Sequence, residues 1–160
     1  MLPITTIIIE KFQYKCIKIL YIIIESSMNI QPIFKKLALA ALVMLMMDSV
    51  YLSSSSGLWN SLMKDLQGSP IELRILPTII VYISMLCGLV YFIFMPYEQH
   101  KNKMRAVYNA ALFGFVLFSV YEFTNYAIIK KWKPLYVIMD SLWGPVLYGV
   151  TTYITLSLLK

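Results

Sequence analysis

Three acidic side chains lie inside the most apolar stretches of the sequence: Asp48, Glu122 and Asp140. Carboxyl groups in surroundings of low polarity can take up a proton, hold a cation or act as a general acid and base. No lysine or arginine falls in the middle of these stretches to neutralise the acids. Their counter-charge is therefore expected to be a proton, a bound cation or a cationic ligand, with lysines of the turn at 130–133 as a weaker option.

The composition is that of a membrane protein. Of the 160 residues, 59% are hydrophobic and 14% are charged, whereas a soluble domain carries about 25% charged residues. Apolar runs of about 18 or more residues indicate transmembrane helices. Four such runs are predicted to span the bilayer, over residues 34–54, 76–94, 106–129 and 135–158. We therefore expect an all-α fold: an integral membrane four-helix bundle in contact with the lipid bilayer, covering residues 28–160.

Two further helices are predicted outside the spans. Residues 1–27 combine isoleucine runs with lysines at helical spacing. This pattern fits either an amphipathic leader helix in the membrane interface or a misassigned extension ahead of Met28. After a serine-rich break at residues 53–57, apolar side chains recur at helical spacing up to Leu66. The second pattern predicts a short interfacial helix after the first span.

The net charge, the cysteines and the histidine limit which partners and cofactors the protein is expected to bind. The net charge of +6 comes from basic residues between the apolar runs, which favours contact with lipid headgroups over a nucleic-acid partner. The spacing of Cys16, Cys87 and the single histidine, His100, matches no metal site, so neither metal nor cofactor is expected. With four spans both ends lie on one side, and the lysine and arginine bias favours cytosolic termini. A chain with so few spans would transport only as a homo-oligomer.

The predicted spans place the three acids at one depth. A helix rises about 1.5 Å per residue, so Glu122 and Asp140 lie roughly 9–10 Å from the turn that joins their helices. Asp48 lies roughly 9 Å from the end of its own span on the same side, and Tyr82 falls in the same layer. The acids are therefore expected to meet inside the bundle.

Neighbouring positions complete the predicted pocket. Asn125 shares a helix face with Glu122, and Trp143 shares one with Asp140, because each pair is three residues apart. Gly114 and Gly149 are expected to let their helices approach closely. Trp132 and Tyr97 are expected to be anchors at the membrane interface. The predicted pocket residues are Asp48, Tyr82, Tyr121, Glu122, Asn125, Asp140 and Trp143.

The order of these features resembles a family of small predicted membrane proteins, the domain of unknown function family 2177, with members in bacteria and in large DNA viruses. The family pattern has an Asp in the first span, a Pro-led second span with a Tyr, Tyr-Asp-x-Thr-Asn in the third, then a Trp, then Asp-x-x-Trp-Gly in the fourth. The matching positions here are Asp48, Pro77, Tyr82, residues 121–125, Trp132 and residues 140–144.

This resemblance covers about residues 29–158 and supports Met28 as the start. Glu122 stands where the family has Asp, which puts a role that needs the shorter carboxylate in doubt. The resemblance implies no reaction, and its viral members make a viral source one option.

Three functions fit these observations. The first is a binding or transport module whose acidic pocket accepts a proton, a cation or a small cationic amphiphile. The second is a structural membrane protein, for example of a viral envelope, in which the polar layer only sets helix packing. The third is an intramembrane enzyme acting on lipid. It ranks last because the sequence has no Gly-x-Gly-Asp motif of intramembrane aspartyl proteases and no Ser/His or Cys/His set.

Overall fold

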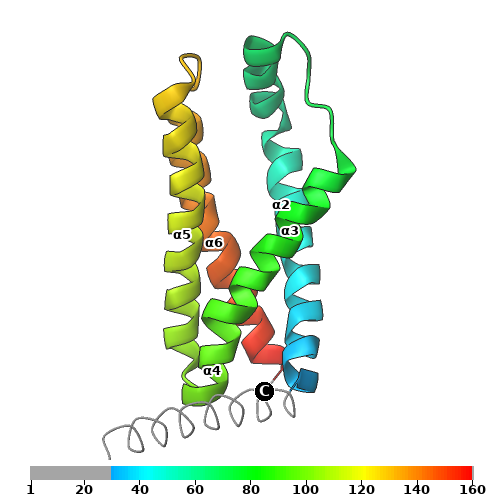
Figure 1. The fold of residues 1–160 in the computed structure, drawn as a ribbon, viewed down its shortest axis with the longest axis vertical. Coiled ribbons are helices and arrows are strands. Elements are labelled where there is room, and N and C mark those ends of the chain that lie inside the picture. Colours follow the sequence, from blue (N-terminus) through cyan, green and yellow to red (C-terminus); the bar gives the residue numbers. More distant parts are fainter. Residues whose placement is uncertain (1–29, 160) are drawn as a thin grey trace, which may run out of the picture. The chain divides into compact units, whose positions relative to one another are not determined.

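The computed structural model describes residues 30–159, and within them the chain forms four helices and no strand (Figure 1). The chain divides into two compact units, Met1–Phe34 and Lys35–Lys160, and the second unit holds the bundle beyond the first turn of α2. The expected all-α helical membrane bundle is confirmed. The predicted leader at residues 1–27 lies outside the described residues.

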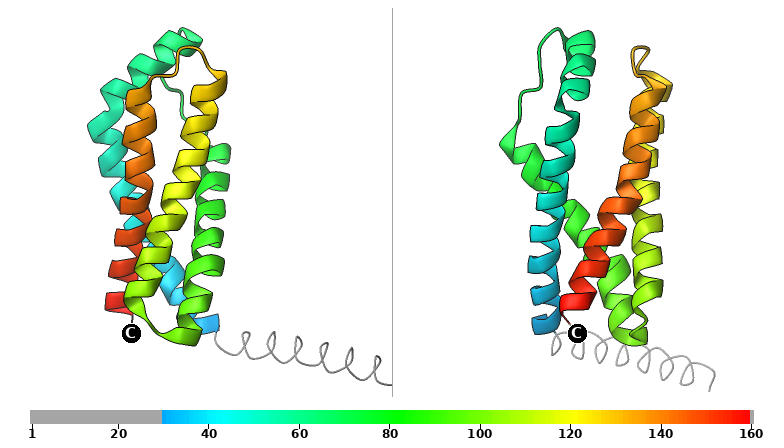
Figure 2. Two further views of the ribbon diagram at one scale, coloured as in Figure 1. Left: turned by 90° about the vertical axis from the view of Figure 1, so that its left-hand side faces the viewer. Right: turned by 180° about the vertical axis from the view of Figure 1, so that it is seen from behind.

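Successive helices of the second unit run in opposite directions (Figures 1 and 2). The first is α2, and the second is continuous through α3, a π-helical segment η1 and α4. The third and fourth, α5 and α6, are joined by the short turn of residues 129–133 and lie side by side (Figure 2). The helix bounds are α2 Ile30–Gln67, α3 Ile75–Leu89, η1 Val90–Phe94, α4 Met95–His100, α5 Lys103–Ile128 and α6 Pro134–Leu158.

The predicted break after the first span is wrong, since α2 is one helix of 38 residues that includes the serine run. The hydroxyl groups of Ser54 and Ser55 each donate a hydrogen bond, 2.7 Å long, to the carbonyl oxygen four residues earlier. Serines whose hydroxyl groups bond to the backbone in this way fit within a helix. The expected separate interfacial helix is instead the end of α2, where Leu62 is fully buried.

The second helix also continues past residue 94, where the second span was predicted to end, and through Pro96. A proline lacks a backbone N–H, and its ring collides with the carbonyl group four residues earlier in a regular α-helix. The wider π-turn of η1 lies directly before Pro96, and the Met95 N–H bonds to the Val90 carbonyl oxygen. This turn lets the helix run on to Lys101, whose left-handed backbone (φ 50°) ends it.

Helices α5 and α6 cross at two glycines. A Cβ atom built on Gly114 would collide with the backbone carbonyl of Gly144, and the reverse also holds. The prediction of close approach is thus confirmed at Gly114, but its partner is Gly144. At Gly149 an added Cβ would meet the Cβ of Ala111 at 3.4 Å, which is an ordinary contact. The two helices therefore meet backbone to backbone at the level of Gly114.

Three of the described helices are long and apolar enough to cross a membrane: Ile33–Gln67, Ile75–His100 and Lys103–Ile128. Helix α6 is not among them, although its 25 residues are long enough. Its buried face carries Thr151, Thr152 and Thr155, which are fully enclosed by the bundle. Apolar side chains cover the outer faces of α3 and α5, where Ile83 and Val116 are at least half exposed. These outer faces are the surface that lipid would cover.

Ion pairs fasten both ends of α2. At its start, the ammonium group of Lys36 is buried, pairs with Glu98 of α4 and lies 5.4 Å from the centre of the Tyr97 ring. At its other end, the carboxylate of Asp65 forms an ion pair of 3.2 Å with the ammonium group of Lys133. Charged groups thus tie α2 to the second helix at one end and to the α5–α6 turn at the other.

Candidate functional site

Asp48 joins three helices. Its Oδ1 accepts a hydrogen bond of 2.8 Å from the indole Nε1 of Trp143 on α6. Its Oδ2 accepts one of 3.0 Å from the hydroxyl group of Tyr82 on α3. Asp48 is 9% exposed, and each of its carboxylate oxygens has a donor. These contacts bring together three of the predicted pocket residues.

Glu122 is the most enclosed of the three acids. It is 0% exposed, and its Oε2 accepts a 2.8 Å hydrogen bond from the indole Nε1 of Trp132. Trp132 is therefore not the expected interface anchor, because it is only 6% exposed and its indole contacts a buried acid. The other oxygen, Oε1, has no hydrogen-bond partner among the described residues.

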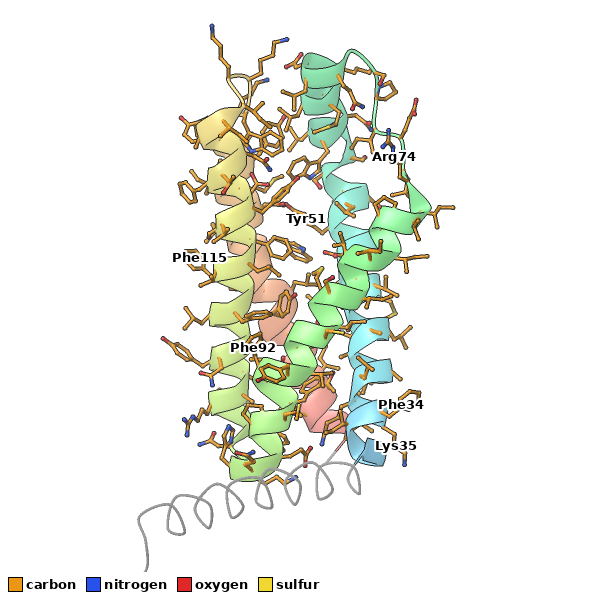
Figure 3. The ribbon with its side chains drawn as sticks, viewed as in Figure 1. Phe34, Lys35, Tyr51, Arg74, Phe92 and Phe115 are labelled. Carbon is orange, nitrogen blue, oxygen red and sulfur yellow. The ribbon has the colours of Figure 1, made fainter. Side chains whose placement is uncertain are left out.

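Asp140 accepts a hydrogen bond from the hydroxyl group of Tyr51 on α2. The Tyr51 ring stacks on Trp143, with ring centres 4.3 Å apart and planes 7° from parallel. Figure 3 shows Tyr51 pointing from α2 towards the α5–α6 pair. Sequence reasoning missed Tyr51, although it follows Asp48 by three residues and so shares its helix face. One aromatic stack thus connects the Asp48 and Asp140 carboxyl groups.

Glu122 and Asp140 lie close enough for their carboxyl groups to interact. Two ionised carboxylates would offer each other no donor, and they would repel. A single proton or cation shared between them would relieve that repulsion. Among the described residues, the ion pairs of Lys and Arg engage only Glu98 and Asp65. No protein cation therefore neutralises this pair within that part of the chain.

Two cavities reach Asp140. One, the α3–α5 cavity, has a volume of about 520 Å³ and is lined by α3 and α5 side chains together with Asp140. The other, the α2 cavity, has a volume of about 500 Å³ and is lined by Leu52, Ser56, Trp59, Asn60 and Ile71 besides Asp140. Tyr121, which is itself exposed, lines both. Asp140 and Tyr121 thus line both cavities.

Asn125 stands apart from this arrangement. Its side-chain Nδ2 is buried without a partner in the described part of the chain, and no hydrogen bond joins it to the three acids. The structure also contains, over the same residues, no group of three His, Cys, Asp or Glu side chains that could hold a metal ion. Of the predicted pocket residues, Asp48, Tyr82 and Trp143 form one contact set, Glu122 and Asp140 form a pair, and Tyr121 lines the cavities.

The site region coincides with a family match. A family model described as "Predicted membrane protein (DUF2177)" matches residues 33–157. This range contains every predicted pocket residue as well as Tyr51 and Trp132. No curated protein and no solved structure matches the sequence.

Proposed function

Because the chain belongs to this family of predicted membrane proteins, we propose that it is a multi-pass protein whose paired carboxylates bind a positive charge. The bound group is a proton, a cation or the head of a small cationic amphiphile. The observation that supports this most directly is the position of Asp140, which pairs with Glu122 and lies on both cavities. A ligand in either cavity would reach a carboxylate that no lysine or arginine of the described residues contacts.

The physical case rests on the cost of burying charge. An isolated carboxylate in apolar surroundings is strongly disfavoured, and a cation nearby offsets that penalty. Aromatic rings beside the pair add attraction for a cation, because the face of a Tyr or Trp ring carries partial negative charge. Tyr51 and Trp143 already stack next to Asp140. Both features favour a bound cationic group over a neutral one.

The four-span arrangement with cytosolic termini belongs to this proposal. It requires α6 to cross the bilayer, with its buried threonine face turned inward and its exposed apolar side chains, such as Ile138 and Leu142, turned towards lipid. If the protein moves its ligand across the membrane, it would do so as a homo-oligomer, since four helices enclose little room for a path of their own.

A structural role for the polar layer is the second candidate, and Asp48 favours it. Both of its oxygens have donors from two other helices, which is the pattern expected of a residue that fixes helix packing. An enzymatic role on lipid stays a third hypothesis, without an assigned reaction. A source in a viral envelope likewise stays a hypothesis.

Binding of an amphiphilic amine tests the first candidate against the second. The purified protein in phosphatidylcholine nanodiscs is titrated with dodecylamine, which is protonated at neutral pH, and with the neutral dodecanol. Dodecylamine is expected to bind, and Asp140→Asn and Glu122→Gln should each weaken it by at least about tenfold, because each removes charge from the pair. The matched control is Glu72→Gln, an equal charge change at an exposed loop position, which should leave binding unchanged.

Two results would contradict the proposal. One is dodecanol binding as tightly as dodecylamine. The other is unchanged dodecylamine affinity in folded Asp140→Asn and Glu122→Gln proteins, which would leave the packing role as the better account of the acids.

A further inference from the structure

The two cavities that Asp140 lines differ in their chemistry. The α3–α5 cavity is lined by Ile80, Val81, Ser84 and Met85 from α3 and by Phe113, Leu117 and Phe118 from α5, besides the shared Tyr121 and Asp140. Apart from Ser84 and the two shared residues, these are hydrocarbon or thioether side chains. The α2 cavity instead includes the hydroxyl group of Ser56, the amide of Asn60 and the indole of Trp59. One cavity therefore suits an apolar chain and the other a polar group.

The α3–α5 cavity runs from the outer face of the bundle to the acid. Its rim residues Ile80, Val81 and Leu117 are 55%, 54% and 40% exposed, on faces that lipid would cover. Its inner residues Met85 and Asp140 are 8% and 9% exposed. An apolar chain in this cavity would thus extend from the lipid side inward and end beside a carboxylate.

The α2 cavity offers polar contacts around the same carboxylate. The Trp59 indole Nε1 is buried and has no acceptor among the described residues, so an oxygen atom of a ligand headgroup would find a donor there. Both volumes lie within the range of roughly 300–1,000 Å³ that is usual for small-molecule sites. The three features that a ligand must match are an apolar tail, one positive charge and a small polar head.

We propose that the ligand is a single-chain membrane amphiphile with one cationic amine. Its chain lies in the α3–α5 cavity, its amine contacts Asp140 and its head extends into the α2 cavity. This inference rests on the proposed function, because it assumes that the carboxylates bind a positive charge. It goes further in assigning the ligand to the bilayer and its chain to the lipid-facing side of α3 and α5.

Photo-crosslinking tests this placement. A dodecylamine probe with a diazirine at the end of its chain is bound to the protein in nanodiscs and irradiated, and the labelled peptides are identified by mass spectrometry. Labels are expected in residues 80–85 and 113–118, and they should be lost in Asp140→Asn and in the presence of excess dodecylamine. Labels in residues 52–60 that depend on Asp140 would overturn the chain placement while leaving the proposed function intact. Labels that do not depend on Asp140 would overturn both.

A steric pair of variants gives a second test that does not alter the acids. Leu117→Trp adds bulk at the rim of the α3–α5 cavity, whereas Val116→Trp adds it at the next position on α5, which is exposed and lies outside the cavity. Dodecylamine affinity is expected to fall by at least about tenfold in Leu117→Trp and to stay unchanged in Val116→Trp. Equal affinity in the two variants would contradict a chain in this cavity.

Discussion

At the scale of single residues, Trp132 supplies the hydrogen bond to Glu122, the most buried of the three acids. Its indole is the one donor to Glu122 found in the described part of the chain. Trp132→Phe keeps most of the ring but leaves a fully buried carboxyl group without a donor, which costs about 1–3 kcal/mol. The apparent free energy of unfolding, measured by denaturant titration in detergent micelles, should fall by that amount.

Trp59 provides a matched control, since it belongs to the same apolar cluster but its indole N–H has no partner among the described residues. Trp59→Phe should therefore cost less than Trp132→Phe. In the Glu122→Leu background, which has no carboxyl group to accept from the indole, Trp132→Phe should lose most of its effect. An equal loss in both backgrounds would mean that Trp132 contributes through ring packing alone.

The level of a residue along the helices was the part of the site that sequence could predict. Counting residues from predicted span ends placed Asp48 level with Tyr82, and the two are hydrogen-bonded. Counting residues could not predict which groups the long aromatic side chains would contact. Tyr51 bridges to Asp140 across two helices, and Trp132 enters the bundle from a turn outside any span. Asn125 shares a helix face with Glu122, yet no hydrogen bond joins its side chain to any of the three acids.

At the scale of helices, the crossing of α5 and α6 makes a sharp prediction. Gly114→Ala places a methyl group against the backbone carbonyl of Gly144, so the two helices must separate, and overpacking of this kind costs about 1–3 kcal/mol. The melting temperature of the protein in detergent, followed by circular dichroism, should fall. Because Trp143 and Asp140 sit on α6 beside the crossing, ligand affinity should fall with it.

Gly57→Ala serves as the control and should act in the opposite direction. Gly57 lies within α2, and an added Cβ there meets nothing within 4 Å. Replacing glycine by alanine in an open helical position stabilises by about 0.5–1 kcal/mol. A Gly114→Ala protein that melts no lower than the wild type would contradict the close crossing.

Apolar runs predicted the helices and their class but not all of their ends. The serine run after the first span resembles a loop in composition, yet its hydroxyl groups bond within α2. Pro96 is a residue that often ends a helix, yet the π-turn before it lets the helix continue through the proline. In both places local hydrogen bonds allow the helix to continue, and composition alone does not reveal them.

At the scale of the whole second unit, α2 is held mainly through long side chains. Ion pairs tie its two ends to Glu98 and to the α5–α6 turn, and between them Asp48 and Tyr51 reach across to α3 and α6. Spacing by large side chains rather than by close backbone contact leaves room for the α2 cavity beside Asp140.

Whether α6 crosses the bilayer decides the topology of this unit. Single cysteines are introduced at Glu72, Gln99, Lys130 and Leu159 after both native cysteines are replaced by serine. Intact and inverted vesicles are then labelled with a membrane-impermeant maleimide. With four crossings, positions 99 and 159 should be labelled from the cytosolic side and positions 72 and 130 from the other, because successive helices alternate in direction.

Comparing the labelling of positions 130 and 159 decides whether α6 crosses, because α6 is the one helix between them. Labelling of both from one side would mean that α6 lies within the membrane without crossing it, and the termini would then fall on opposite sides. The buried threonine face of α6 and its crossing with α5 at Gly114 favour a full span. Because α5 is apolar and long enough to span, an antiparallel helix of 25 residues packed along it has the length to return across the same bilayer.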